Sequence, residues 1–295
     1  MDFQDEDTPL AAAAAAAVYV RRGLKGTFPR PKETRVITVA NQKGGVGKTT
    51  SAVNLAASMA LAGLNVLVID LDPQGNASTA FGVDHQEGAQ GTYDVLVDKA
   101  PIAEMMVEAP KYETLWVLPA SLDLAGVDIQ LITDVAEADR PFLLRGSLEA
   151  FLAEYDMDYI FVDCPPSLGL LTINALAAVS EVLIPIQCEF YALEGVQQLM
   201  RTIEFARERL NPDLEVSTIL LTMYAQTTNL SQQVADEVKA YFGKKVLESI
   251  IPRSVYVAEA PSFGESVMTY DPGSTGAVAY LAAAKEIAER GRKGI

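Results

Sequence analysis

The sequence has few residues of the kinds that carry disulfide, histidine or nucleic-acid chemistry. Its 295 residues include two cysteines, one histidine and 23 lysines and arginines, against 39 aspartates and glutamates. Two cysteines exclude a disulfide framework. Because Cys164 and Cys188 follow strand-like apolar runs, they are predicted to be buried thiols. The single histidine, His85, lies in a polar segment and is predicted to be a surface residue. The net charge of −16 repels a polyanion at long range, although a local basic patch can override it.

The chain also lacks an uninterrupted apolar run of roughly 18 residues, the length needed to cross a membrane. Residues 1–34 begin with acids, pass through a run of alanines and end in a basic stretch punctuated by Gly and Pro. This order is not that of a signal peptide, and such low-complexity composition is typical of a mobile tail. We therefore expect a tail over residues 1–34, one domain over residues 35–290 and a frayed end over residues 291–295.

Strand-like and helix-like segments alternate along the domain. The apolar content of 49% allows one large core. Strands are predicted at residues 36–40, 65–70, 114–118, 158–163, 181–186, 217–222 and 246–251. Helices are predicted at residues 51–60, 141–154, 168–178, 193–210, 230–242 and 277–290. Such alternation predicts an α/β fold in which helices flank a mostly parallel, twisted sheet.

The most specific motif is the segment 43–50, Lys-Gly-Gly-Val-Gly-Lys-Thr-Thr. It follows a predicted strand and precedes a predicted helix, which is the context that a phosphate-binding loop requires. Glycines let successive N–H groups turn toward phosphate oxygens, and the helix dipole adds to the attraction. Lys48 is placed to reach the β- and γ-phosphates, and Thr49 to bind Mg²⁺. The predicted nucleotide-binding residues are Gly44, Gly45, Val46, Gly47, Lys48, Thr49 and Thr50.

The loop departs from the standard pattern at Gln42, where a glycine is usual. A second lysine, Lys43, stands near the start of the loop instead. It can fold back onto the phosphates of its own nucleotide, point outward to a nucleotide on a neighbouring subunit, or remain a solvated surface lysine. The sequence leaves these alternatives open.

Two acids stand at the ends of further apolar strands. Asp72 follows the strand 65–70, and Asp163 ends the strand 158–163. Ligands of parallel α/β sheets bind at the carboxyl ends of the strands, so both side chains are expected beside the phosphates. One carboxylate can hold Mg²⁺ through water while the other orients the attacking water.

Together these motifs resemble those of the ParA/MinD group of deviant Walker-type ATPases, and most closely its ParA (Soj-like) branch. The resemblance runs from about residue 35 to about residue 288. It is carried by residues 41–50 (NQKGGVGKTT), 70–76 (DLDPQGN), 163–168 (DCPPSL), 185–195 (PIQCEFYALEG), 251–253 (IPR) and 259–262 (EAPS). It implies a P-loop ATPase fold with a deviant Walker A motif, ATP and Mg²⁺ as cofactors, and a homodimer that forms on ATP binding.

The resemblance also implies roles for single residues. Lys43 matches the signature lysine that reaches the partner's nucleotide in an ATP sandwich dimer, and Lys48 matches the phosphate lysine. Asp72 matches the carboxylate that positions the attacking water. The predicted catalytic residues are Lys43, Lys48 and Asp72. The predicted magnesium group is Thr49, Asp72 and Asp163. The predicted adenine contacts are Met223, Pro252 and Arg253.

Two further features of relatives are not expected in this chain. Nitrogenase-type ATPases share an iron–sulfur cluster across their dimer, which is an alternative role for Cys164 and Cys188, although the family match explains both cysteines without a metal. MinD-like relatives end in a membrane-binding amphipathic helix. In this chain acids interrupt the C-terminal cations and bulky apolar residues are few, so no membrane contact is expected.

Relatives that bind chromosomal DNA carry arginines on the dimer face, and the alignment by eye implies that several are missing here. Their positions are occupied by Thr227, Tyr256, Gly273 and Thr275. Non-specific DNA affinity comes mainly from phosphate neutralisation, so each loss weakens it. DNA binding is therefore in doubt. The cations that remain near the expected surface are Lys239, Lys244, Lys245 and Arg253.

Two functions follow from the resemblance. The first is an ATPase that organises cellular cargo, in chromosome partitioning or in division or protein positioning. Its hydrolysis would be slow and stimulated by a ParB-like or other activator, in the bacterial cytoplasm, at the nucleoid or at division or polar sites. The N-terminal tail is either the contact for that activator or only solvated. The alternative is a nucleotide-gated interaction module that hydrolyses little ATP, and an intact Asp72 favours the first.

Overall fold

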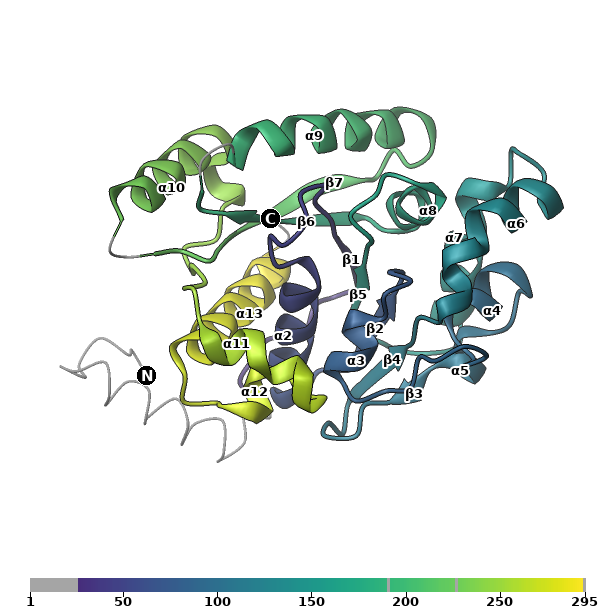
Figure 1. Ribbon diagram of the computed structural model, residues 1–295, viewed down its shortest axis with the longest axis horizontal. Helices are drawn as coiled ribbons and strands as arrows, with labels where there is room; N and C mark the ends of the chain where they lie inside the picture. Colours follow the sequence, from purple (N-terminus) through teal and green to yellow (C-terminus); the bar gives the residue numbers. More distant parts are fainter. Residues whose placement is uncertain (1–25, 190–191, 226–227, 294–295) are drawn as a thin grey trace.

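The computed structural model of the chain describes residues 26–189, 192–225 and 228–293. A seven-stranded sheet runs through these residues in the order β3-β4-β2-β5-β1-β6-β7, and the edge strand β3 is antiparallel to its neighbour while the other pairs are parallel (Figure 1). The strands are β1 (Arg35–Val39), β2 (Val66–Asp70), β3 (Val107–Glu108), β4 (Leu115–Leu118), β5 (Tyr159–Asp163), β6 (Glu181–Gln187) and β7 (Glu215–Thr222). The predicted α/β fold with a mostly parallel sheet is confirmed.

Helices cover both faces of the sheet (Figure 1). The α-helices of the described residues are α2 (Lys48–Leu61), α3 (Asn76–Ala80), α4 (Thr92–Val97), α5 (Ile102–Met105), α6 (Val127–Asp134), α7 (Leu143–Leu152), α8 (Leu170–Ala178), α9 (Ala192–Arg209), α10 (Asn229–Phe242), α11 (Val255–Glu259), α12 (Val267–Tyr270) and α13 (Thr275–Lys293). The helices α2, α12 and α13 pack on one face, whereas α4 and α6 to α10 pack on the other. Each face therefore has its own hydrophobic core.

The strands β2 and β5 are buried along their whole length. Successive side chains of β5 enter the two cores in turn, as Ile160 and Val162 lie in one and Phe161 in the other. A strand covered on both faces needs apolar residues at every position, which is why continuous apolar runs predicted these strands. Both runs end in an acid, Asp70 and Asp163, so carboxyl groups appear at the carboxyl edge of the sheet.

One predicted strand is wrong. Residues 246–251 follow the short 3-10 helix η4 (Gly243–Lys245) and contact β7 through an isolated bridge at Val246. The carboxylate of Glu286 on α13 accepts the backbone N–H groups of Glu248 (3.0 Å) and Ser249 (3.1 Å), so these groups do not pair with β7. An apolar run looks the same in the sequence whether its N–H groups bind a strand or a side chain on a distant helix.

The folded body extends beyond both predicted limits of the domain. Gly26 donates its N–H to a backbone carbonyl just after α2, the Phe28 side chain is buried, and Arg30 pairs with Asp158. At the other end, α13 continues to Lys293. Residues 1–25 and 294–295, which hold most of the predicted tail and the last part of the predicted frayed end, lie outside the described residues.

Candidate functional site

The loop between β1 and α2 turns sharply before the helix begins. Gly45 (φ 74°) and Gly47 (φ 88°) are left-handed, a conformation that a side chain makes costly. The hydroxyl of Thr222, at the end of β7, donates to the carbonyl oxygen of Val46 at 2.9 Å and so ties the loop to the sheet. No side chain caps the start of α2. Its first N–H groups therefore remain free to bind an anion.

Two lysines flank this loop. Lys48 is buried, and its ammonium donates to the carbonyl oxygen of Lys43 at 3.3 Å. Burial lowers the pKa of Lys48, while the carboxylates of Asp163 and Asp72 favour its charged form. An ammonium has three hydrogens, so Lys48 keeps donors for a further anion. Lys43 is half-buried, and its Cβ lies beside Gly195 of α9.

Two carboxyl groups meet at the carboxyl ends of β2 and β5. Asp70 and Asp163 are paired in register across these strands, and both are fully buried. Neither carboxylate oxygen of Asp163 has a hydrogen bond. Burial, together with the neighbouring Asp70 and Asp72, raises the pKa of Asp163 well above its usual range, against the smaller opposing effects of Thr49 and Lys48. A buried carboxylate that accepts no hydrogen bond is costly, so this position favours a proton or a cation.

Asp70 was not among the predicted site residues, yet it orders the loop that follows β2. Its Oδ2 accepts the N–H (2.9 Å) and the hydroxyl (2.7 Å) of Ser78, and its Oδ1 accepts the N–H of Asp72 at 3.2 Å. Burial raises the pKa of Asp70 to about 6 despite these bonds. The signal in the sequence is an acid inside an apolar strand, two residues before a second acid.

Asp72 lies two residues beyond β2 and is buried. Its Oδ1 accepts the N–H of Gln74 at 3.0 Å, and its carbonyl oxygen accepts the N–H of Gly75 at 2.8 Å. These bonds close a tight turn around the carboxylate. The structure thus brings Lys48, Asp72 and Asp163 to one edge of the sheet, as the sequence predicts.

The unpaired atoms of this edge indicate what it can bind. Gln42 Nε2 and both carboxylate oxygens of Asp163 are buried without a hydrogen bond. The described residues contain no group of three or more His, Cys, Asp or Glu side chains that could hold a metal. The buried carboxylate of Asp163, close to the Thr49 hydroxyl, fits a hard cation such as Mg²⁺, which takes oxygen ligands.

A cavity of about 250 Å³ opens beside the first turn of α2. Thr49 and Thr50 line it from α2, Asn76 and Thr79 from α3, and Pro261 from the segment after α11. Larger clefts of about 620 Å³ and 730 Å³ lie away from the loop. We identify the candidate site by its position beside the phosphate loop and by the chemistry of its lining residues, because the larger clefts lie elsewhere.

Known proteins are similar to this chain in sequence. Residues 34–216 match the family model described as an AAA domain. The chromosome partitioning protein ParA of Caulobacter vibrioides (strain NA1000 / CB15N) is 49% identical over 258 residues, which are 88% of this chain and 95% of that protein. The sporulation initiation inhibitor protein Soj of Bacillus subtilis (strain 168) is 49% identical over 257 residues, or 87% of this chain and 99% of that protein. The chain belongs to the ParA/MinD family. Within the family it falls in the ParA (Soj-like) branch.

A solved structure has the same fold. Cobyrinic acid a,c-diamide synthase from Mycobacterium smegmatis, with bound ADP and magnesium, matches with a TM-score of 0.75 and 35% sequence identity. The match covers 89% of this chain and 97% of that one.

In this member of the ParA/MinD family, the two segments predicted to flank the adenine come together. Tyr224 and Pro252 form a parallel bridge, and the N–H of Arg253 donates to the carbonyl oxygen of Tyr224 at 3.2 Å. Met223 is left-handed with φ 50°, which is uncommon for a residue with a side chain. Both segments lie next to Thr222, which holds the phosphate loop.

The positions expected to have lost ParA-family arginines are only partly described. Tyr256 on α11 is 49% exposed, Thr275 is exposed at the start of α13, and Gly273 is half-buried. Thr227 lies outside the described residues.

The remaining cations differ in their pairing. Arg253 pairs with Glu189 at 3.1 Å, and Lys239 pairs with Glu248 at 3.7 Å. In the part of the chain that the structure describes, Lys244 has no ion pair within 4 Å, and the same holds for Lys245.

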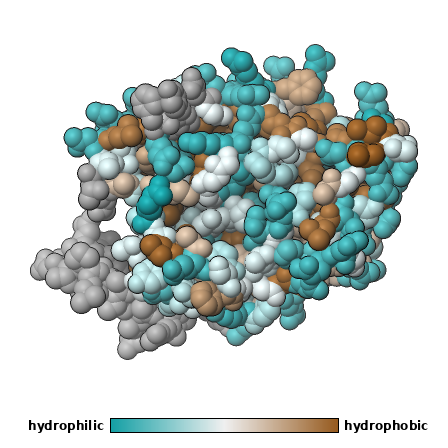
Figure 2. Space-filling view, in the orientation of Figure 1, coloured by the Kyte–Doolittle hydropathy of each residue, from teal (hydrophilic) through white to brown (hydrophobic). Residues whose placement is uncertain are grey.

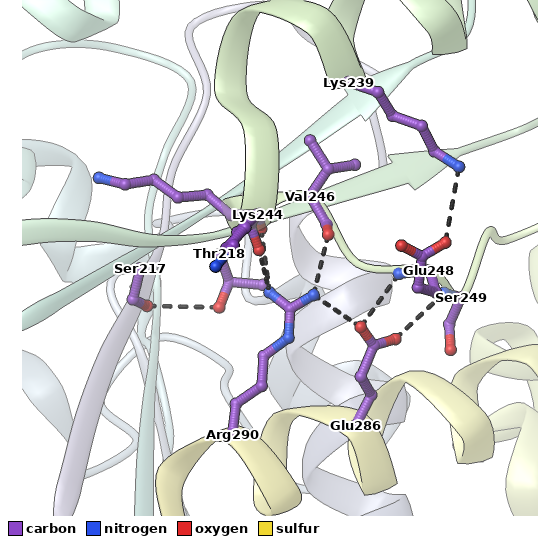
Figure 3. A network of polar contacts seen from close by, with 10 residues as sticks. Ser217, Thr218, Lys239, Lys244, Val246, Glu248, Ser249, Glu286 and Arg290 are labelled. Atoms are coloured by element: carbon purple, nitrogen blue, oxygen red, sulfur yellow. Dashed lines mark hydrogen bonds and ion pairs between the residues drawn. The ribbon is translucent and has the colours of Figure 1, made fainter. Parts of the chain in front are cut away.

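The two unpaired lysines belong to η4 and line the cleft of about 730 Å³. Arg290 of α13 donates to the carbonyl oxygens of Lys244 (2.9 Å) and Val246 (2.8 Å) and to the carboxylate of Glu286 at 2.7 Å, so its donors are directed into the protein (Figure 3). This cleft lies at the amino end of β7, whereas Thr222 and the phosphate loop lie at the carboxyl end.

The two cysteines are buried free thiols, as predicted. Cys164 Sγ lies 3.1 Å from the hydroxyl of Thr38. The prediction for His85 is only half right, because one edge of its ring is buried against the turn that follows Asp72. Over the visible face of the molecule, hydrophobic residues are interspersed with hydrophilic ones (Figure 2). Among the described residues, no helix is both long enough and apolar enough to pass through a bilayer.

Proposed function

We propose that this protein is a ParA-type ATPase that binds ATP with Mg²⁺ and hydrolyses it. The observation that carries the proposal is Asp163, a fully buried carboxylate that accepts no hydrogen bond and lies close to the hydroxyl of Thr49 and the buried ammonium of Lys48. A bound cation and a bound polyphosphate would offset the cost of burying these charged groups.

Each predicted residue has a role in this proposal. The backbone of Gly44 to Thr50 and the free N-terminus of α2 bind the phosphates, and Lys48 binds the β- and γ-phosphates. Thr49, Asp72 and Asp163 would hold Mg²⁺. The bound ion would neutralise charge that develops on the phosphates. Asp72 orients the attacking water, because its turn holds the carboxylate at the edge of the site. Met223, Pro252 and Arg253 flank the adenine.

ATP binding also assembles the dimer in this proposal. Lys43 reaches across to the nucleotide of the second subunit, consistent with a half-buried side chain at the rim of the loop. In the alternative, Lys43 folds back onto the phosphates of its own nucleotide. Both arrangements place one Lys43 and one Lys48 beside each nucleotide, so repulsion between the ammonium groups does not choose between them, and the outward arrangement rests on the resemblance to the ParA/MinD family.

The cellular role we propose is spatial organisation, either in chromosome partitioning or in positioning of other machinery. Relatives named for chromosome partitioning, at 49% identity across most of the chain, support it. Slow hydrolysis stimulated by a ParB-like or other activator, in the bacterial cytoplasm or on the nucleoid, would complete the cycle. A nucleotide-gated module without hydrolysis is the second candidate, and the ordered turn at Asp72 favours the ATPase.

The test compares nucleotide binding with phosphate release. Fluorescent ATP titration and a phosphate-release assay are run on the wild type, Lys48→Ala and Asp72→Ala, with Lys285→Ala as a matched surface lysine. We expect Lys48→Ala to lose binding, and Asp72→Ala to bind ATP but not hydrolyse it. Unchanged titration in Lys48→Ala would remove the phosphate-loop assignment. Wild-type hydrolysis in Asp72→Ala would remove its water-positioning role.

A further inference from the structure

The turn that carries Asp72 ends at Gly75, and its hydrogen bonds continue into α3. Gly75 donates its N–H to the carbonyl oxygen of Asp72 at 2.8 Å. The carbonyl oxygen of Gly75 in turn accepts the N–H of Thr79 at 2.8 Å and the hydroxyl of Thr79 at 2.9 Å. Gly75 is left-handed with φ 61°, and no side chain caps α3 there. The position of the Asp72 carboxylate therefore depends on what holds Gly75.

His85 holds this turn through Thr79. Its Nε2 lies 2.7 Å from Thr79 Oγ1. A hydroxyl has one hydrogen, and the Thr79 hydroxyl donates that hydrogen to Gly75, so it accepts from Nε2–H. This network places a hydrogen on Nε2. The imidazole thus orients the hydroxyl that binds the turn.

The same ring also fills the space behind Gly75. A Cβ placed on Gly75 would lie 2.5 Å from Nδ1 of His85 and 2.7 Å from Cγ. Real side chains do not approach so closely, so the imidazole packs directly on the backbone of Gly75. Nδ1 is buried there without a hydrogen bond. One side chain thus braces the turn by contact and, through Thr79, by a hydrogen bond.

The loop that carries His85 is itself fixed. Within the loop, Asp84 accepts the N–H of Gln86 at 3.2 Å. Further along, the N–H of Gly88 donates to the carboxylate of Asp123, in the 3-10 helix that leads into α6, at 3.2 Å. The imidazole is therefore held from both the loop and the turn, and a change at His85 is transmitted to the backbone at Gly75.

We propose that His85 is a positioning residue for ATP hydrolysis: it fixes the turn from Asp72 to Gly75 through Thr79, and so places the Asp72 carboxylate for the attacking water. The inference rests on the proposed ATPase function. His85 touches neither nucleotide nor water in this role, so its loss slows the chemical step and leaves ATP affinity intact. A misplacement of about 1 Å can lower a rate by up to about a hundredfold, and partial loosening of a turn should cost less.

The test measures kcat, KM and the dissociation constant of fluorescent ATP for the full chain with Mg²⁺. His85→Ala should lower kcat about tenfold and leave both KM and the dissociation constant within about twofold. His85→Gln keeps an N–H near the position of Nε2 and should recover most of the lost rate. Thr79→Val removes the relay hydroxyl and should match His85→Ala, with no further loss in the double variant. Thermal unfolding of each variant checks the fold.

Three outcomes would overturn the inference. They are wild-type kcat in folded His85→Ala, no recovery in His85→Gln, or losses that appear in ATP affinity and not in kcat. Additive losses from Thr79→Val and His85→Ala would equally exclude the relay. Failure of the underlying function looks different, because the wild type itself would then release no phosphate above the Asp72→Ala background.

Discussion

Asp70 and Asp163 lie opposite each other on neighbouring parallel strands, but only the carboxylate of Asp70 accepts hydrogen bonds. Both carboxyl groups are fully buried. In the sequence both residues show the same pattern, an acid at the end of a strand, so the sequence does not distinguish their roles. The hydrogen bonds of Asp70 fix the loop that follows β2, whereas the carboxylate of Asp163 is available to bind a ligand.

The first prediction follows from this difference. Asp70→Asn places an amide donor against the donors of Ser78, and the free energy of unfolding should fall by about 2 kcal/mol. Asp163→Asn replaces a buried carboxyl group that accepts no hydrogen bond, so the unliganded protein should keep its stability or gain about 1 kcal/mol. Urea unfolding of both variants measures these values.

Stabilisation by a bound nucleotide should be affected more by Asp163→Asn than by Asp70→Asn. A non-hydrolysable ATP analogue with Mg²⁺ at about 100 times its dissociation constant should stabilise the wild type by about 2.7 kcal/mol. Asp163→Asn should lose most of that gain, whereas Asp70→Asn should retain part of it. Equal effects of the two substitutions would mean that the unpaired carboxylate is not the cation ligand.

The second prediction concerns the anchor at the opposite end of the sheet. Arg35 makes two hydrogen bonds of 2.7 Å to the carboxylate of Glu181 and one of 2.7 Å to the carbonyl oxygen of Ile287 on α13. Glu181→Ala would leave a mostly buried guanidinium without its anion, at a cost of about 3 kcal/mol. The exposed pair Lys285–Glu289, 4.0 Å apart, is the control, and Glu289→Ala should cost about 0.5 kcal/mol or less. Similar losses in the two variants, measured by urea unfolding, would contradict the anchor.

The sequence predicts the phosphate loop and the two acidic strand ends because each is a short, contiguous motif whose geometry follows from its own residues. It does not predict contacts between distant segments. Glu286 takes the N–H groups of Glu248 and Ser249, so the run 246–251 bonds to β7 only near its two ends, and nothing near that run indicates it. The brace of His85 on Gly75 is hidden for the same reason, since a polar loop does not reveal which backbone it covers.

The third prediction is a loss of stability in alkali. Burial raises the pKa of Cys188 from an ordinary value of 9.0 to about 11. Between those values the unfolded chain releases the thiol proton while the folded chain keeps it, so the free energy of unfolding falls as pH rises. The slope should approach about 1.4 kcal/mol per pH unit for this group. Cys188→Ala should remove that part of the slope in urea unfolding between pH 8 and 11, and an unchanged slope would contradict the assignment.

The fourth prediction tests the role of Lys43. Asp72→Ala should accumulate an ATP-bound dimer, because assembly continues while hydrolysis stops. Adding Lys43→Ala should return it to monomer while ATP titration changes by no more than about threefold, since the ammonium contributes to the partner's nucleotide. Sedimentation velocity with ATP or ADP measures this. A dimer that persists in the double variant would favour the folded-back or solvated alternative.

The last prediction concerns DNA binding, which the net charge disfavours and a local pair of lysines favours. The chain has a net charge of −16, but the unpaired Lys244 and Lys245 lie together in a cleft at the amino end of β7. We expect weak, salt-sensitive binding of double-stranded DNA by the Asp72→Ala dimer with ATP and Mg²⁺. Substituting both lysines by glutamate should lower the salt slope of log K by about 2, because each phosphate contact contributes about 0.9. Fluorescence anisotropy across a salt series measures this, with Lys285→Glu as the control. If the protein is confirmed to be a dimer but binds no DNA even at low salt, repulsion by the acidic surface outweighs the attraction of these lysines. We would then expect the dimer to bind a protein in a positioning role.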